Sequence, residues 1–169
     1  AEEMDRLFSI CQQHKVLIIS DEIHQDLITG LTPFTSALTV SKGAYTDRLI
    51  AMSSLSKSFN IASLHHAEVI IPDEELRNHY NAFKALVYHT DSDVLAEAAI
   101  TAAYTHPEAE AWLTDLLNVV KENYDYMCNK LLANLPELRI SPMDGTYLAW
   151  IDFSAYLKPE EMHDFFENR

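Results

Sequence analysis

Glycine is scarce in this sequence, with 3 among 169 residues, where roughly 7% is usual. Gly30, Gly43 and Gly145 stand far apart along the chain. The sequence therefore contains no glycine-rich loop of the kind that wraps a phosphate with backbone N–H groups. A phosphate site built from this chain must use side-chain hydroxyls and helix ends, or groups from elsewhere.

Cysteine, positive charge and long apolar runs are also sparse. Cys11 and Cys128 lie in helix-like segments, which favours reduced packing residues of a cytoplasmic protein over a disulfide framework. Lys and Arg number 12 against 26 Asp and Glu, and the net charge of −14 disfavours nucleic acid or an anionic membrane as partner. No apolar run is long enough to cross a bilayer, and we expect no signal peptide. At 48% hydrophobic and 22% charged, the chain is globular.

Helix and strand patterns alternate in the first part of the chain. Helical spacing or helix-start signals are found at residues 1–14, 72–87 and 92–104. Short apolar segments predict strands at residues 16–19, 48–53 and 67–71. The strand at 16–19 is apolar on both faces, which is typical of a buried parallel strand, and the alanine-rich helix at 92–104 is expected to be well buried. The connection over 31–45 is predicted to be irregular.

A long helix is predicted over residues 108–135. Its apolar face comprises Trp112, Leu113, Leu116, Leu117, Val120, Tyr124, Met127, Leu131 and Leu135. Strands are expected at 138–141 and 146–153, joined by a Pro-Met-Asp-Gly turn, with a further helix at 159–167. We expect an α/β fold with a mostly parallel sheet and flanking helices, and the chain looks like part of something larger.

Asp21 directly follows the first predicted strand, where open α/β sheets place their ligands. One alternative is a helix N-cap or an ordinary loop acid. Another is the acid of a nucleotide-hydrolysing site, because four aliphatic residues precede the Asp-Glu pair. That site also needs a loop with a Gly-Lys pair, which this sequence lacks. A nucleotide-hydrolysing domain is therefore disfavoured.

A second polar segment, Ser-Ser-Leu-Ser-Lys-Ser-Phe-Asn over residues 53–60, follows the second predicted strand. A solvated turn is one interpretation. A lysine held near a site interior can instead lose its proton and form a Schiff base with a carbonyl. In that case Lys57 is the reactive group, and the hydroxyls of Ser54 and Ser56 are candidate phosphate donors.

Together these segments resemble the pyridoxal-phosphate (PLP) enzymes of aminotransferase fold type I, class I/II. The resemblance is closest to the cystathionine β-lyase-like C–S lyase branch that includes the MalY and PatB proteins. The matching segments keep family order along the chain: residues 20–24, 54–61, 70–77, 102–104 and 145–152. The resemblance implies a PLP-binding large domain over 1–107, a connecting helix over 108–135 and the start of a small α+β domain over 136–169.

The resemblance also implies a role for five residues. Lys57 would be the Schiff-base lysine and the base that moves the Cα proton. Asp21 would pair with the pyridinium nitrogen, which keeps the ring able to accept electrons. His24 stands where many aminotransferases have a tyrosine bonded to the cofactor's phenolic oxygen. Ser54 matches a phosphate-binding serine, and Ser56 is a weaker phosphate candidate.

The sequence departs from the family after the lysine. Ser63 and His65 occupy the places where many aminotransferases have a glycine and a phosphate-binding arginine, and losing that arginine favours lyase over transaminase. His65, His66 and Glu68 are unexpected there. A metal site is one interpretation, but adjacent histidines cannot comfortably bind one ion. We expect a local substitution and no metal.

The function implied is a PLP-dependent enzyme acting on amino acids. A C–S β-lyase would act on a sulfur-containing substrate and give pyruvate, ammonia and a thiol; the same lysine would also serve an aminotransferase. A cytoplasmic homodimer is implied, without nucleic acid or membrane as partner. The family's phosphate loop and carboxylate-binding arginine have no match in this chain, so we expect it to be inactive alone. The alternative is a non-catalytic fragment or interaction module of such an enzyme.

Overall fold

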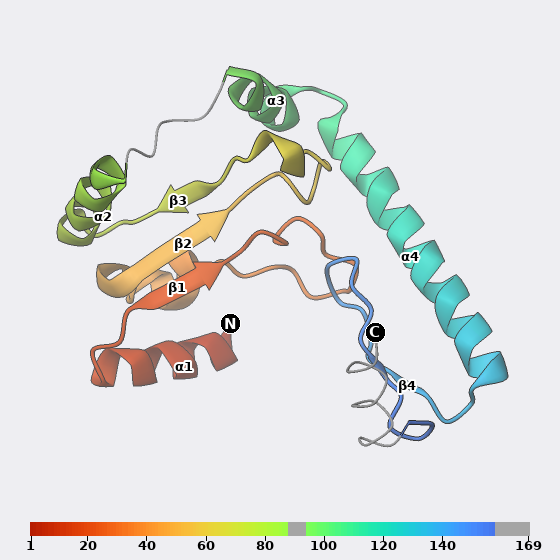
Figure 1. The fold of residues 1–169 in the computed structure, drawn as a ribbon. Helices are drawn as coiled ribbons and strands as arrows, with labels where there is room; N and C mark the ends of the chain where they lie inside the picture. Colours follow the sequence, from red (N-terminus) through yellow and green to blue (C-terminus); the bar gives the residue numbers. More distant parts are fainter. Residues whose placement is uncertain (88–93, 158–169) are drawn as a thin grey trace. The chain divides into compact units, whose positions relative to one another are not determined.

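The computed structural model describes residues 1–87 and 94–157 (Figure 1). The chain divides into two compact units. The first unit comprises residues 1–26 and 33–113, and the second comprises residues 27–32 and those from 114 onward. The helix predicted at 159–167 lies outside the described residues, and the domain boundaries at 107 and 135 stay predictions.

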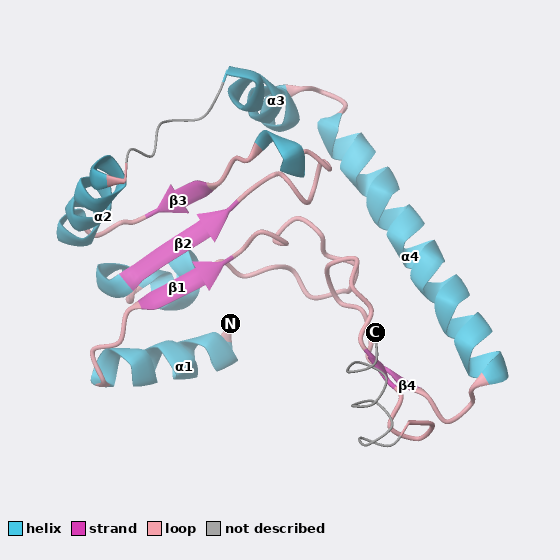
Figure 2. Ribbon diagram, viewed as in Figure 1, coloured by secondary structure: helices cyan, strands magenta, loops and turns pink. Residues whose placement is uncertain are grey.

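The first unit contains a three-stranded sheet, whose strands lie side by side in Figure 2. The strands are β1 (Ile18–Asp21), β2 (Leu49–Ser53) and β3 (Glu68–Ile70), in the order β1-β2-β3. β1 and β2 are parallel, whereas β3 runs antiparallel to β2. All three predicted strands are therefore present in an α/β fold, and the sheet is mixed.

The first strand begins two residues later than predicted, because the chain reverses before it. α1 (Glu2–Gln13) is followed by Lys15 in the left-handed region, with φ at 55°. The Val16 N–H then donates to the Cys11 carbonyl at 2.8 Å. Val16 and Leu17 therefore belong to the connection after α1, and pairing with β2 starts only at Ile18.

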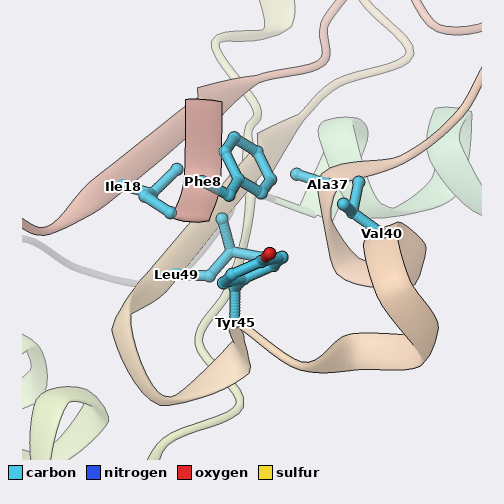
Figure 3. Packing of buried hydrophobic residues seen from close by; sticks show 6 residues of the cluster. All are labelled: Phe8, Ile18, Ala37, Val40, Tyr45 and Leu49. Atoms are coloured by element: carbon cyan, nitrogen blue, oxygen red, sulfur yellow. The ribbon is translucent and has the colours of Figure 1, made fainter. Parts of the chain in front are cut away.

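The core of the first unit lies on one face of this sheet. Its members are Phe8, Ile18, Ala37, Val40, Tyr45 and Leu49 (Figure 3). They come from α1, from the strands, and from the 3-10 segment Ala37–Gly43 and its surroundings. The rings of Phe8 and Tyr45 meet edge to face, with centroids 5.6 Å apart. The Tyr45 hydroxyl also donates to the Asp5 carboxylate, at 2.8 Å.

The expectation that the first strand is buried on both faces is wrong for the described residues. Successive side chains of a strand point to opposite faces. Ile18 faces the core and is 7% exposed, whereas Ile19 faces the other way and is 60% exposed. Within residues 1–87 and 94–157, packing covers Ile18 and leaves Ile19 open. Asp21, two residues after Ile19, therefore lies on the open face.

Two helices complete the first unit before the long one. α2 (Glu74–Leu86) begins as predicted, because the Asp73 side chain caps it by accepting a hydrogen bond from the Leu76 N–H at 2.8 Å. α3 (Val94–Thr105) is also a helix, but the expected deep burial is wrong. Ala96 is 1% exposed, whereas Leu95 is 71% exposed. Apolar residues on all sides of a helix do not determine how many of those sides pack against other elements.

The long helix α4 (Ala109–Asn134) starts in the first unit and continues into the second. The predicted apolar face is confirmed within it, since its half-buried residues include Leu113, Leu116, Leu117, Val120, Tyr124, Met127 and Leu131. Trp112 is the exception at 45% exposed, and it stacks on Phe59 with ring centroids 5.3 Å apart. Among the described residues, no helix has the length and apolar character needed to cross a membrane.

The second unit pairs β4 (Arg139–Ile140) with β5 (Ile151–Asp152) in antiparallel fashion. Both strands are shorter than predicted, because the intervening residues pair elsewhere. Gly145 forms a bridge with Ile28, and the Thr146 N–H donates to the Leu27 carbonyl at 2.7 Å. Gly30 packs so closely on this turn that an added Cβ would lie 2.9 Å from the Asp144 Cα. A glycine is therefore required there.

Candidate active site at the end of β1 and β2

The candidate residues lie at one edge of the sheet. Asp21 is the last residue of β1, and it is opposite Met52 of the parallel strand β2. The chain leaves β2 after Ser53 and enters the loop that carries Lys57. Parallel strands end at the same edge, and β1 and β2 end side by side (Figure 1), so Asp21 and this loop follow neighbouring strand ends. The Glu22 N–H donates to the Met52 carbonyl at 2.7 Å and joins the two strand ends.

Asp21 and His24 belong to the turn after β1. The Asp21 Oδ1 accepts a hydrogen bond from the Ile23 N–H at 3.2 Å, which is an Asx-type turn. Asp21 is exposed and His24 is half-buried. The exposed carboxylate retains lone pairs for a donor presented from the open face, such as a protonated ring nitrogen.

Lys57 lies in a compact coil anchored by its neighbours. The Phe59 N–H donates to the Leu55 carbonyl at 2.9 Å, and the Ile61 N–H donates to the Ser56 carbonyl at 3.1 Å. Leu55 is 3% exposed, whereas Lys57 is half-buried. The backbone around Lys57 is thus fixed by hydrogen bonds and burial, while Lys57 itself stays partly exposed.

Ser54 and Ser56 differ in how the structure uses them. Ser54 is 3% exposed, and its hydroxyl donates to the His66 carbonyl at 2.7 Å. Its Oγ also accepts a hydrogen bond from the Ser56 N–H at 3.1 Å. A hydroxyl has one proton to donate, so Ser54 must release His66 before it can donate to a phosphate. Ser56 is half-buried in the same loop.

Glu22, next to Asp21, is a buried structural acid that the sequence analysis missed. It is 7% exposed, and its carboxylate accepts three hydrogen bonds. The donors are the Ser20 hydroxyl at 3.1 Å, the Ser36 hydroxyl at 2.8 Å and the Ala37 N–H at 2.7 Å. Adjacent residues of a strand point to opposite faces, so the Asp-Glu pair in the sequence already indicated that one of the two acids faces the core. Glu22 therefore holds the fold, whereas Asp21 lies exposed beside it.

Of the unexpected residues, His66 and Glu68 lie close together, and Glu68 is hydrogen-bonded to Tyr104. His65 adopts a left-handed conformation, with φ at 49°, after a short 3-10 turn. The His66 Nε2 lies 3.8 Å from the Glu68 Oε1. Both Glu68 carboxylate oxygens lie 3.1 Å from the Tyr104 hydroxyl, which donates to this carboxylate. Across residues 1–87 and 94–157, no three potential metal-ligating side chains form a cluster.

The pKa of Tyr104 is raised to about 12. The largest cause is burial, which disfavours the phenolate, followed by the negative charge of Glu68 and the hydrogen bond to it; Asp26 adds a smaller charge effect. The Tyr104 hydroxyl is therefore a donor over the whole physiological pH range. It links α3 to the β3 strand through Glu68.

Comparison with known proteins identifies the family. The family model described as "Aminotransferase class I and II" matches residues 1–168. This chain belongs to the class I and II aminotransferase family. The sheet edge that carries Asp21 and Lys57 is thus part of an aminotransferase-family fold.

Within this family, the chain is similar to two named bacterial proteins. It is 33% identical over 158 residues to "Cystathionine beta-lyase PatB" of Bacillus subtilis, covering 92% of this chain and 39% of that protein. It is 35% identical over 164 residues to "Protein MalY" of Escherichia coli, covering 96% of this chain and 40% of that protein. The chain therefore spans about two fifths of the length of these relatives.

Solved structures of the family show the same fold. Cystalysin from Treponema denticola, described as containing a pyridoxal 5′-phosphate cofactor, matches with a TM-score of 0.88 at 26% identity, over 98% of this chain and 41% of that chain. A PLP-bound C–S lyase from Staphylococcus hominis matches with a TM-score of 0.80 at 34% identity, over 94% and 38%. The predicted α/β class and family resemblance are confirmed.

Replacing Tyr104 with phenylalanine should change how stability depends on alkaline pH in this aminotransferase-family protein. The pKa of Tyr104 is about 12 in the folded protein, above its ordinary value of about 10 in the unfolded chain. The protonated hydroxyl therefore contributes its full stability below about pH 10, and this contribution is lost as the pH rises through 12. The free-energy difference between wild type and Tyr104→Phe, measured by urea unfolding, should be constant from neutral pH to about pH 9 and shrink above about pH 10.

The loss at neutral pH should be below about 1 kcal/mol, because the hydroxyl is partly exposed. Tyr126→Phe is the control, since Tyr126 is 66% exposed on α4. A difference for Tyr104→Phe that stays constant up to pH 12 would contradict the raised pKa of Tyr104.

Proposed function

We propose that this chain is part of a PLP-dependent enzyme that acts on amino acids as a C–S β-lyase. The observation that carries the proposal is the placement of Lys57 and Asp21 at the ends of neighbouring parallel strands. Further support comes from relatives named cystathionine beta-lyase and from similar structures described as PLP-bound C–S lyases. The chain spans about 40% of those relatives, so the activity proposed is that of the whole protein.

The side chains at this edge match the chemical groups of pyridoxal 5′-phosphate. The cofactor has an aldehyde, a basic ring nitrogen and a phosphate. Lys57 supplies an amine for the aldehyde, and Asp21 supplies an exposed carboxylate for the ring nitrogen. His24 lies in the same turn as Asp21 and would contact the phenolic oxygen. Ser54 and Ser56 are the candidate phosphate donors, with Ser54 first giving up its bond to the His66 carbonyl.

Each of these residues has a defined task in the proposed reaction. The cofactor, when bound, accepts the electron pair released at the substrate Cα. Lys57 holds the cofactor covalently, and after the substrate's amino group replaces its amine, the free amine accepts the Cα proton. Asp21 holds a proton on the ring nitrogen. The Cβ–S bond then breaks with its electrons on sulfur, which takes up a proton and leaves as a thiol. Water hydrolyses the remaining aminoacrylate to pyruvate and ammonia.

An aminotransferase is the second candidate, because the chain is also 24% identical over 159 residues to "Kynurenine--oxoglutarate transaminase 1" of the rat. The lyase is favoured because Ser63 and His65 replace the glycine and arginine found in many aminotransferases. We further propose a cytoplasmic homodimer in which a second copy of the protein completes the site. Pyruvate release from cystathionine, measured against amino transfer to an added 2-oxo acid, distinguishes the two activities.

Borohydride reduction tests the assignment of Lys57. The protein at its natural length is mixed with PLP, reduced, digested and mapped by peptide mass. We expect the pyridoxyl group on Lys57, because that amine is held in the site by its buried neighbours. Lys15, Lys42 and Lys121 in the same digest are the internal controls. Modification scattered over these lysines, with Lys57 no more labelled than the others, would contradict the assignment.

A further inference from the structure

Three hydrogen bonds join the turn after β1 to the segment that carries Lys57. The Glu22 N–H donates to the Met52 carbonyl at 2.7 Å. The Gln25 side-chain amide donates to the Ser53 hydroxyl at 2.9 Å. The Ser58 hydroxyl donates to the Asp26 Oδ2 at 2.8 Å. The first two attach at the end of β2, before the loop, and the third attaches beyond Lys57.

The Ser58–Asp26 bond has a fully buried donor. Ser58 is 0% exposed, and no other serine described has so little exposed surface. Its acceptor is a carboxylate, and hydrogen bonds to ionised acceptors are shorter and stronger than neutral ones. Water cannot replace Asp26 at a hydroxyl that has no accessible surface. Asp26 is half-buried, so losing the bond would leave mainly the Ser58 hydroxyl without a partner.

The two ends of the Lys57 loop are thus tied to different parts of the fold. On the N-terminal side, the Ser54 hydroxyl donates to the His66 carbonyl. On the C-terminal side, Ser58 donates to Asp26, which lies two residues after His24 and five after Asp21. The peptide bond to Ser58 is the next link after Lys57. The Ser58–Asp26 bond therefore limits how far the Lys57 backbone can shift relative to the Asp21 turn.

We propose that Ser58 and Asp26 are a positioning pair that sets the Lys57 amine against Asp21 and His24. This inference rests on the proposed roles of Lys57 and Asp21. Neither Ser58 nor Asp26 touches the reacting atoms; they act by holding Lys57 where its amine meets the bound cofactor and the substrate Cα–H. A misplacement of about 1 Å at a reacting group can cost about a hundred-fold in rate.

Removing and restoring the hydroxyl tests the pair in the protein at its natural length. Ser58→Ala should lower kcat for pyruvate release from cystathionine by about ten- to a hundred-fold, with KM changed less than about threefold. The rate of borohydride-fixed labelling of Lys57 should fall in parallel. Ser58→Thr keeps the hydroxyl and should recover kcat to within about fivefold of wild type. This recovery separates positioning from a loss of fold.

Tyr45→Phe is the matched control. This variant also removes a hydroxyl that donates a hydrogen bond to an aspartate of the first unit, at 2.8 Å. Tyr45, however, precedes β2, whereas Ser58 follows it. Tyr45→Phe should lower the melting temperature and leave kcat and Lys57 labelling at the wild-type level. If Ser58→Ala does not fold, Asp26→Ala provides the test, since it removes the carboxylate that accepts the Ser58 hydrogen bond and should lower kcat about tenfold.

The outcomes separate this inference from the proposed function. A wild-type protein that is not labelled at Lys57 overturns the proposed function and, with it, the inference. Wild-type labelling at Lys57 together with an unchanged kcat in Ser58→Ala or Asp26→Ala overturns the inference alone. Equal losses of kcat in Ser58→Ala and Tyr45→Phe also overturn it, because stability would then explain both.

Discussion

Replacing Lys57 with alanine should abolish covalent attachment of PLP and lower turnover of the protein by at least about a thousand-fold. The side chain has two tasks in the proposed reaction, since its amine binds the cofactor and then accepts the Cα proton. Alanine removes both tasks at a half-buried position without adding volume. The measurements are peptide mapping after borohydride reduction and pyruvate release from cystathionine.

Two further variants make this prediction specific. Lys57→Arg keeps the positive charge, but a guanidinium stays protonated and does not act as the nucleophile or base, so it should be as inactive as alanine. Lys42→Ala removes an exposed lysine of the same unit and should have wild-type activity. Fixation of the cofactor on the Lys57→Ala protein at the wild-type level, or turnover within about tenfold of wild type, would contradict the assignment.

The features that sequence alone predicted well are those governed by local chemistry. The apolar face of α4 follows from helical spacing, and Leu116, Val120 and Tyr124 are half-buried as expected. The start of α2 follows from Asp73, whose carboxylate accepts a hydrogen bond from a backbone N–H three residues later. Spacing and capping act within a few residues, so they can be read without knowing the rest of the fold.

The features that sequence missed depend on distant partners. The antiparallel direction of β3 and the early end of the β4–β5 pairing are set by which segments meet. The exposure of Leu95 on α3 likewise depends on what packs there, and an apolar sequence does not state it. Helix or strand propensity depends on the residues of the element itself, whereas burial depends on which other segments pack against it.

The same distinction holds in the candidate site. The position of Asp21 and Lys57 at strand ends follows from the alternation of strands and polar segments. The bond from Ser58 to Asp26 joins residues 32 positions apart, and nothing in their local sequence indicates it. The bond from the Ser54 hydroxyl to the His66 carbonyl is equally non-local. The sequence could therefore identify the candidate residues Asp21 and Lys57, but the hydrogen bonds that fix the loop around Lys57 are visible only in the structure.

Replacing Asp21 with asparagine should leave PLP attached to Lys57 and lower turnover by about a hundred- to a thousand-fold. The amide oxygen of the introduced side chain can still accept the hydrogen bond from the Ile23 N–H, so the turn after β1 is preserved. The negative charge is lost, and with it the group that keeps the ring nitrogen of the cofactor protonated. In the proposed reaction, attachment needs only the Lys57 amine, whereas removal of the Cα proton needs the charged ring.

The separation of attachment from turnover is the sharpest feature of this prediction, because unfolding would remove both. Asp152→Asn is the matched control: the Asp152 Oδ1 also accepts a hydrogen bond from a backbone N–H two residues later, that of Ser154, at 2.8 Å. That hydrogen bond holds the pKa of Asp152 below its usual range, so this variant removes a charged cap of the same type in the second unit and should keep kcat. Asp21→Ala also loses the turn bond and should be no more active than Asp21→Asn. Turnover of Asp21→Asn within about threefold of wild type would exclude Asp21 as the partner of the ring nitrogen, while leaving the role of Lys57 intact.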